Sequence, residues 1–232
     1  MAAQLPFTAE QFFQVFARYN LAIWPAQWLL IGLALTAVGV VVLRLPAAGR
    51  IVVIILAALW FWMGFVYHIV FFASINPAAR LFGVTFVLQG MLLLWMGFRT
   101  PPSFRVTSDA SGLVGGALMF YALVVYPLLG YVAGHRFPAT PTFGAPCPTT
   151  IFTLGLLLWI PGPLPWRVVV VPVAWAIIGT FAAIRLSVPQ DYGLAAAAVV
   201  TLALLARRSA SRRRAGSNSQ RIATIPIPAQ RQ

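Results

Sequence analysis

The chain has 232 residues, of which 61% are hydrophobic and only 8% are charged. Soluble domains carry about a quarter charged residues, so this composition excludes an ordinary soluble globular protein. The net charge of +13 comes entirely from arginine, because the sequence contains no lysine. Several apolar runs approach the ~20 residues that a helix needs to cross a bilayer, and we therefore predict an integral membrane protein.

The arginines gather where apolar runs end. Six of the sixteen lie between Arg207 and Arg221, and most of the others fall in short connections. Arginine in that position sets membrane topology and attracts anionic headgroups. We therefore expect the lipid bilayer and anionic lipid headgroups as partners, and no nucleic acid.

The N-terminal segment from Thr8 to Tyr19 predicts an amphipathic helix. Thr8 and Gln11 have the spacing of a capping box. Apolar side chains repeat on one helical face, at Phe12, Val15, Phe16 and Tyr19. Two interpretations stay open: a helix lying in the membrane interface, or a helix packed on its own bundle.

The rest of the chain predicts an all-α, polytopic transmembrane bundle. We expect about seven spans, at residues 25–43, 51–72, 79–98, 112–132, 149–160, 166–184 and 192–206. The fifth run is short, because twelve residues reach only about 18 Å, and a re-entrant segment is the alternative. Residues 1–206 would form one membrane domain. Residues 207–232, rich in Arg, Ser, Gln and Pro, are predicted to form a disordered cytoplasmic tail.

Arginine asymmetry predicts the orientation. With seven spans and an inner tail, the outer side holds only Arg18, Arg80, Arg136 and Arg185. The inner side holds the tail cluster together with Arg44, Arg50, Arg99, Arg105 and Arg167. This bias favours an outer N-terminus and a cytoplasmic C-terminus.

The same topology places most of the unusual polar residues near the outer face. Ionisable side chains within a membrane are costly, so they indicate a functional site. The candidate ligand-binding residues are His68, Arg80, His135, Cys147, Thr149, Thr150 and Asp191. Each also has a structural interpretation: His68 hydrogen-bonded to a neighbouring helix, Asp191 as a helix cap beside Arg185, and the threonines as caps.

Cys147 is the only cysteine and lies between Pro146 and Pro148. Proline chemistry predicts a rigid outer turn here, with a helix beginning around Thr149. The helix dipole would then favour a reactive thiolate. With His135 or His68, that thiolate could bind a soft metal, although a small residue fitting a tight turn explains Cys147 equally.

Motifs for catalysis are missing from the sequence. It contains no Gly-rich phosphate loop, HExxH, GxSxG or close carboxylate pair, and only three acidic residues. We therefore assign no catalytic residue and no cofactor, and an enzyme is the less expected class.

Two stretches carry a family resemblance: LPFTAEQFFQVFARYNLAIWPAQ at 5–27 and FGAPCPTTIFTLGLLL at 143–158. They resemble a family of uncharacterised bacterial multi-pass membrane proteins, classed as a domain of unknown function, with a PCPTTIFT-type signature. The resemblance implies a bacterial inner-membrane location, and it supplies no activity.

Three functions fit these observations. The first is a small transporter or channel with an outward-facing polar site, which a continuous polar cavity would favour. The second is a redox or metal-handling protein, which convergence of Cys147, His68 and His135 would favour. The third is a structural or accessory subunit, which a dry bundle with an exposed apolar groove would favour.

Overall fold

A computed structural model of the protein describes residues 5–162 and 164–223, with side chains as far as residue 212. Every regular element in these residues is a helix, which confirms the all-α prediction. The first half contains α1 (Ala9–Ala22), α2 (Ala26–Val42), α3 (Ala48–Trp62), the π-helical η1 (Met63–Phe71), the 3₁₀ turn η2 (Phe72–Ser74) and α4 (Ala79–Arg99). The second half contains α5 (Ala110–Phe120), the π-helical η3 (Tyr121–Val125), α6 (Tyr126–Val132), α7 (Pro146–Leu158), α8 (Arg167–Leu186), the 3₁₀ turn η4 (Pro189–Asp191) and α9 (Tyr192–Ala223).

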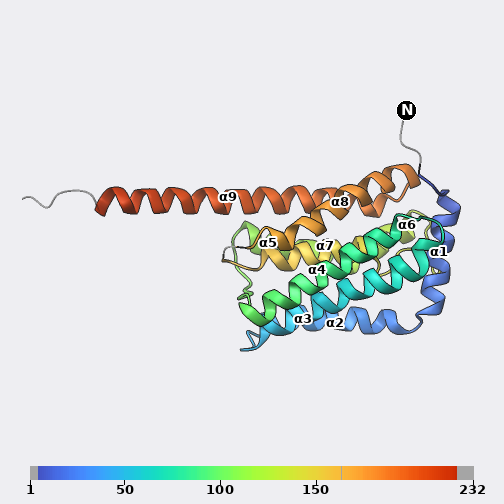
Figure 1. The fold of residues 1–232 in the computed structure, drawn as a ribbon, viewed down its shortest axis with the longest axis horizontal. Coiled ribbons are helices and arrows are strands. Elements are labelled where there is room, and N and C mark those ends of the chain that lie inside the picture. The colour runs from blue at the N-terminus through green and yellow to red at the C-terminus, as the bar shows by residue number, and fades with distance from the viewer. Residues whose placement is uncertain (1–4, 163, 224–232) are drawn as a thin grey trace, which may run out of the picture.

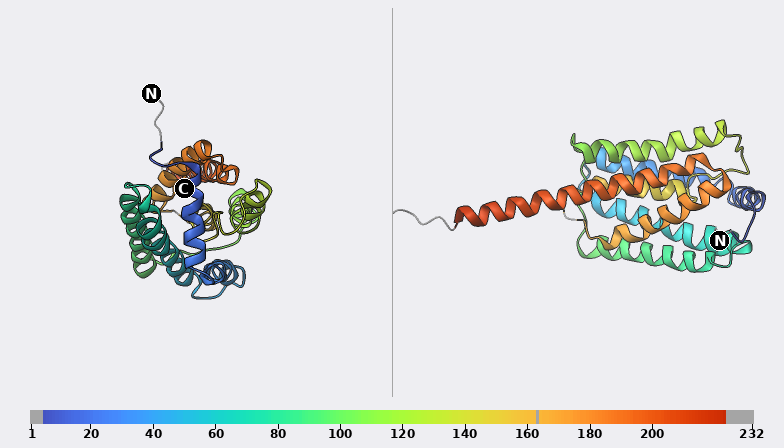
Figure 2. Two further views of the ribbon diagram at one scale, coloured as in Figure 1. Left: turned by 90° about the vertical axis from the view of Figure 1, so that its right-hand side faces the viewer. Right: turned by 90° about the horizontal axis from the view of Figure 1, so that it is seen from above.

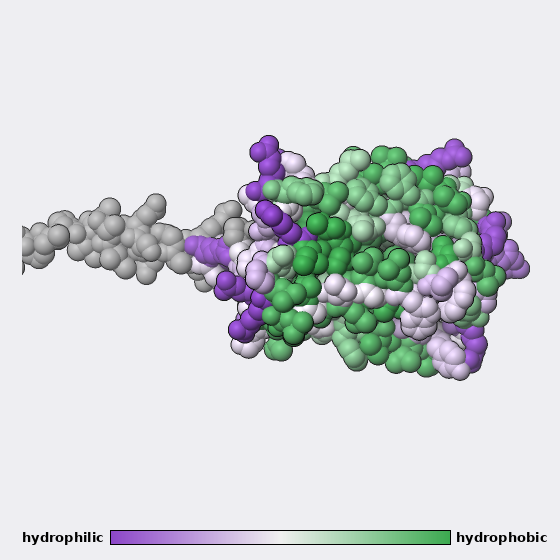
Figure 3. Space-filling model, turned by 90° about the horizontal axis from the view of Figure 1, so that it is seen from below, coloured by the Kyte–Doolittle hydropathy of each residue, from purple (hydrophilic) through white to green (hydrophobic). Residues whose placement is uncertain are grey.

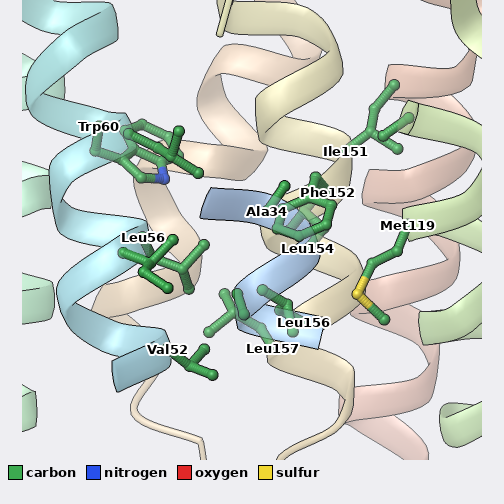
Figure 4. Close-up of a cluster of buried hydrophobic side chains, with 14 of the residues drawn as sticks. Ala34, Val52, Leu56, Trp60, Met119, Ile151, Phe152, Leu154, Leu156 and Leu157 are labelled. Carbon is green, nitrogen blue, oxygen red and sulfur yellow. The ribbon is translucent and has the colours of Figure 1, made fainter. Parts of the chain in front are cut away.

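The helices run side by side along one bundle, and α1 lies across its end (Figures 1 and 2). Helix α7 is enclosed by the others, because all its residues from Pro146 to Leu158 are buried. Its apolar side chains form the centre of the core with α3 and α5, through residues such as Leu56, Trp60 and Met119 (Figure 4). The centre of the bundle is therefore apolar.

The predicted count of seven spans is not confirmed. In the described parts of the chain, five helical segments are long and apolar enough to cross a membrane: Ala48–Ser74, Ala79–Arg99, Ala110–Val132, Arg167–Leu186 and Pro189–Arg212. The count rises to six if α1 and α2, which meet at 87°, form one broken span. Helix α7 has 13 residues and reaches only about 20 Å, against a hydrocarbon thickness of ~30 Å.

The outer surface of the bundle suits a bilayer. The face in Figure 3 has a hydrophobic band with hydrophilic residues gathered at its two ends. Large apolar side chains such as Leu81, Leu113 and Ile177 are more than 60% exposed. A soluble protein rarely exposes so much contiguous apolar surface, so the described helices are compatible with a membrane protein.

Helix α1 follows from its sequence closely. The Thr8 hydroxyl accepts from the Gln11 N–H, and the Gln11 side chain accepts from the Thr8 N–H, which confirms the capping box. The predicted apolar face is buried, with Phe12, Phe16 and Tyr19 in one cluster. Tyr67 of η1 belongs to the same cluster, so α1 packs on its own bundle, the second of the two interpretations.

Helix α7 begins three residues earlier than predicted. We expected an outer turn at 146–148 and a helix from Thr149, whereas Ala145 is the N-cap and Pro146 is the first helical residue. The first N–H groups of a helix have no intrahelical partner, so proline fits there without losing a bond. Both Pro146 and Pro148 occupy that first turn, and Cys147 is inside the helix rather than on an exposed turn.

The structure describes part of the predicted tail, from residue 207 to Ala223. Helix α9 continues through residue 207 to Ala223 and extends beyond the bundle (Figure 1), while 224–232 lie outside the described residues. Alanine, arginine and glutamine favour helix, and elongation adds a hydrogen bond per residue to an existing helix. Arg208 also donates to the carbonyl oxygens of Ile160 and Leu158, at 2.8 and 2.9 Å, which fixes the start of the extension.

Pairs of glycines bring two helix pairs into close contact. A Cβ added to Gly115 of α5 would lie 2.7 Å from the Gly155 oxygen of α7, and one added to Gly155 would lie 2.7 Å from the Gly115 oxygen. Gly64 and Gly83 have the same relation between η1 and α4, at 2.8 and 2.9 Å. Small residues let helix backbones approach closely in membranes.

Asp109 caps α5 at the end of the bundle opposite α1. Its carboxylate accepts from the Thr107 hydroxyl at 2.6 Å and from the Gly112 N–H at 2.9 Å. These hydrogen bonds hold the pKa of Asp109 below its usual value, because they favour the ionised form.

Replacing Asp109 with alanine should lower the free energy of unfolding by about 1 kcal/mol, because the N-cap is lost. The difference should be full above the unfolded-state pKa of ~3.9 and should shrink toward that of a neutral cap as the pH falls through the lowered folded-state pKa. Thermal unfolding in detergent from about pH 7 to about pH 2 measures it. Asp109→Asn, which keeps a cap, is the control, and a pH-independent difference for Asp109→Ala would contradict the assignment.

Candidate functional site

Two π-helical segments lie in the helices beneath α1. η1 carries Tyr67 and His68, and η3 leads directly to Tyr126 at the start of α6. A π-helical turn shifts the direction of the side chains that follow it, and such turns are frequent at functional sites. The three side chains are fully buried and face the region where α7, α8 and the start of α9 meet.

Asp191 is the acidic residue buried at this end of the bundle, with 2% of its surface exposed. It ends the turn η4, and its carboxylate accepts a short hydrogen bond from the Tyr126 hydroxyl. The Cys147 thiol lies against the same carboxylate. The preceding residue holds the turn in place, because the Gln190 carbonyl accepts from the Tyr121 hydroxyl at 2.6 Å.

A cavity of about 120 Å³ adjoins this carboxylate. Asp191, Cys147, Tyr67 and Asn76 supply its polar groups. Its remaining wall is largely aromatic and comes from Phe7, Phe12, Phe16, Phe72, Phe82, Phe181 and Trp175. Because Phe12 and Phe16 belong to α1, that helix covers the cavity and separates it from the end of the bundle.

His68 lies behind the cavity wall. Its ring is 4.9 Å from the Trp175 ring and 4.6 Å from the Phe86 ring, and it is fully buried. Within the part of the chain that the structure describes, neither of its nitrogens has a hydrogen-bond partner, so the structural alternative, a bond to a neighbouring helix, is not found there. A buried polar group without a partner costs about 1–3 kcal/mol, and such a group in a native fold calls for an explanation.

The predicted site residues separate into three sets. Cys147 and Asp191 meet at the cavity, and His68 contacts its wall through Trp175. His135 does not line the cavity. Its Nδ1 lies 3.1 Å from Nε2 of Gln190, the residue that precedes Asp191.

The other three predicted residues lie elsewhere. Arg80 is exposed and does not line the cavity. Thr149 and Thr150 are buried in α7: the Thr149 hydroxyl accepts from the Gly144 N–H at 3.1 Å, and the Thr150 hydroxyl has no partner. Among the described residues, no group of three or more His, Cys, Asp or Glu side chains could hold a metal ion.

Sequence reasoning missed Tyr126, Trp175 and Tyr67. Tyr67 and Tyr126 are hydroxyl-bearing aromatics inside predicted spans, where a buried hydroxyl requires a partner. That requirement was a usable signal, although the partner itself comes from another helix.

The comparison with protein families agrees with the resemblance of the sequence. Residues 9–216 match the model of a family described as "Family of unknown function (DUF6064)". The chain belongs to this family. The match to DUF6064 includes α1, Cys147 and Asp191, and so covers most of the cavity. The comparisons with curated proteins and with solved structures found no match.

The description of DUF6064 names no activity, so the chemistry of the site is read from its geometry. Aromatic faces attract cations through the ring quadrupole, and one carboxylate supplies a formal negative charge. The volume equals that of about four waters at ~30 Å³ each. The cavity therefore suits a small solute with a positive charge and an apolar surface.

Proposed function

We propose that this protein is a transport-type membrane protein that binds a small organic cation, an amine or a quaternary ammonium, in the cavity beside Asp191. The observation that carries the proposal is a buried carboxylate in an aromatic-walled cavity, in a chain whose net charge is +13. A buried charge is costly unless a partner of opposite sign compensates it. A cationic solute would supply that partner.

Tyr126 and Cys147 position the carboxylate in this proposal. The Tyr126 hydroxyl donates to Oδ1 of Asp191 and the Cys147 thiol lies against the same carboxylate, whose remaining lone-pair positions would face the solute. Helix α1 acts as the lid, because Phe12 and Phe16 close the cavity from the end of the bundle. The 87° bend between α1 and α2 is where the lid would move.

The orientation proposed from the sequence would make this lid face outward. In the fold, Arg18 of α1 donates to the Ser74 hydroxyl at 3.1 Å, next to the start of α4. Arg208 contacts the opposite end of α7. The arginine-poor side of the predicted topology thus coincides with the α1 end, which supports an outer N-terminus and a cytoplasmic C-terminus in a bacterial inner membrane.

Solute binding and uptake test the proposal. Detergent-purified protein should bind tetramethylammonium in calorimetry and should bind the neutral tert-butanol at least tenfold more weakly. Asp191→Asn should weaken tetramethylammonium binding at least tenfold, since two opposite charges ~4 Å apart attract by about 4 kcal/mol at an effective dielectric constant of ~20 and 1.4 kcal/mol is about tenfold. Proteoliposomes should take up the labelled cation only with the unchanged protein.

Asp109→Asn is the matched control, because that aspartate lies at the other end of the bundle. Equal loss of binding in both aspartate variants, or equal affinity for the two solutes, would contradict the cation site. Binding without uptake would leave a binding protein and exclude transport.

An accessory subunit is the second candidate, and the long α9 favours it. This helix has 32 residues and spans about 48 Å at ~1.5 Å per residue, so it extends well beyond the bundle (Figure 2). A projecting helix of this length offers a docking element for another protein.

A further inference from the structure

A groove of about 660 Å³ lies on the outside of the bundle, between α8 and α9. Its floor is apolar and includes Val170, Val173, Ile177 and Leu202. One end is basic, with Arg208, Ser209 and Arg212. Trp166, which is 70% exposed, lies in the lining as well.

The length of this groove along α9 matches the hydrocarbon thickness of one bilayer leaflet. Leu202 and Arg212 both line it and are ten residues apart on α9, which corresponds to about 15 Å along the helix. Half of a ~30 Å hydrocarbon core is also about 15 Å. Tryptophan is enriched at membrane–water interfaces, and Trp166 accordingly marks the basic end as the headgroup level.

The arginines at that end are held in place. Arg208 donates to the Leu158 and Ile160 carbonyls, and Arg212 donates to the Pro161 carbonyl at 2.7 Å. A guanidinium carries about five N–H donors, so donors remain on both side chains after these bonds. Anchored guanidinium groups lose less side-chain freedom when they bind an anion.

The charge at this end is positive. Asp109 is the described carboxylate that interacts electrostatically with Arg208, and its own hydrogen bonds go to Thr107 and Gly112. Arg212 has no such counterpart among the acidic residues, since Glu10 belongs to α1 and Asp191 to the cavity beneath it. Arg212 is therefore the stronger candidate for a phosphate contact.

We propose that the α8–α9 groove binds one anionic phospholipid, with its phosphate at Arg212 and Arg208 and one acyl chain along Val173 and Ile177. The site recognises charge at the headgroup and apolar length along the chain. It is independent of the cation cavity, because the groove and the cavity share no lining residue.

A lipid fits these features better than a partner helix does. The apolar floor is as long as one leaflet is thick. A transmembrane partner helix would need an apolar face that extends across both leaflets. The basic end also matches a phosphate, to which arginine donates well.

Native mass spectrometry of the whole protein tests this assignment. The protein is released from micelles containing equal amounts of dioleoylphosphatidylglycerol and dioleoylphosphatidylcholine. We expect one phosphatidylglycerol retained per chain, in preference to phosphatidylcholine. Arg212→Gln should reduce its retention about fivefold, from ~1 kcal/mol per arginine at an anionic surface.

Two further variants make the test specific. Arg99→Gln removes an exposed arginine at the end of α4 that does not line the groove, and it should leave retention unchanged. Ala174→Phe fills the exposed groove without changing its charge, and it should reduce retention as much as Arg212→Gln.

Each remaining outcome would overturn the proposal. Equal retention of the two lipids would show that the site does not select an anionic headgroup, and unchanged retention by Ala174→Phe would show that no acyl chain lies in the groove. An equal loss of phosphatidylglycerol retention in Arg99→Gln and Arg212→Gln would show that any surface arginine attracts the anionic lipid, and that the groove has no specific role. A second protein retained in place of lipid, and lost with Ala174→Phe, would make the groove a protein interface. Circular dichroism confirms that each variant is folded.

Discussion

Replacing Gly115 with alanine should lower the free energy of unfolding by about 3 kcal/mol, at the upper end of ordinary overpacking. The added Cβ would lie 2.7 Å from the Gly155 carbonyl oxygen and 2.8 Å from the Trp159 ring. A backbone oxygen cannot rotate away as a flexible side chain can. Helices α5 and α7 would have to separate, and α7 is the centre of the core.

The adjacent Gly116 provides the control for this prediction. A Cβ there meets only the Trp159 ring, at 3.9 Å. Because alanine favours helix over glycine by ~0.8–1.0 kcal/mol, Gly116→Ala should stabilise the protein slightly. Denaturant unfolding in detergent measures both variants. Similar changes for the two glycines would show that α5 and α7 are not in backbone contact.

Replacing His68 with phenylalanine should raise the free energy of unfolding by about 1–3 kcal/mol, the cost of a buried polar group that lacks a partner. The ring lies among Phe86, Trp175 and Phe82, so another aromatic ring suits the site. A residue that lowers stability where it stands is expected at a functional site, because stability and activity often conflict. We therefore expect His68→Phe to be more stable than the unchanged protein in denaturant unfolding.

His135 is the matched control, because it is also a histidine beside a phenylalanine but has a polar partner. Its ring is 4.4 Å from the Phe13 ring, and Gln190 lies 3.1 Å from its Nδ1. His135→Phe should be destabilising, since it leaves the Gln190 amide without that contact. If His68→Phe were destabilising too, the His68 imidazole would have a polar partner in the native protein.

Local signals in the sequence were sufficient for α1. The capping box of Thr8 and Gln11 and the apolar face of Phe12 and Phe16 involve residues three or four apart, and both were predictable. The all-helical class followed from composition alone. These features depend on residues that are close in the chain.

The cavity depended on contacts that the sequence does not encode locally. Tyr126 and Asp191 are 65 residues apart and meet only because α6 and the start of α9 share one end of the bundle. The start of α7 was misplaced because Pro148 was expected to keep the preceding residue, Cys147, out of the helix, whereas Pro146 and Pro148 both lie in the first turn. The extension of α9 was not predicted, because its polar composition was interpreted as disorder, whereas a helix that has already formed can be elongated at the gain of one hydrogen bond per residue.

Helix α9 makes a stiff mechanical connection between the two ends of the molecule. It starts immediately after Asp191, contains no proline, and runs without a break to Ala223. A rod of this kind transmits a sideways load along its length unless it bends. Because Arg208 holds the helix against the carbonyl oxygens of Leu158 and Ile160, a load on the distal end would act on the bundle first at that point, where α9 leaves it.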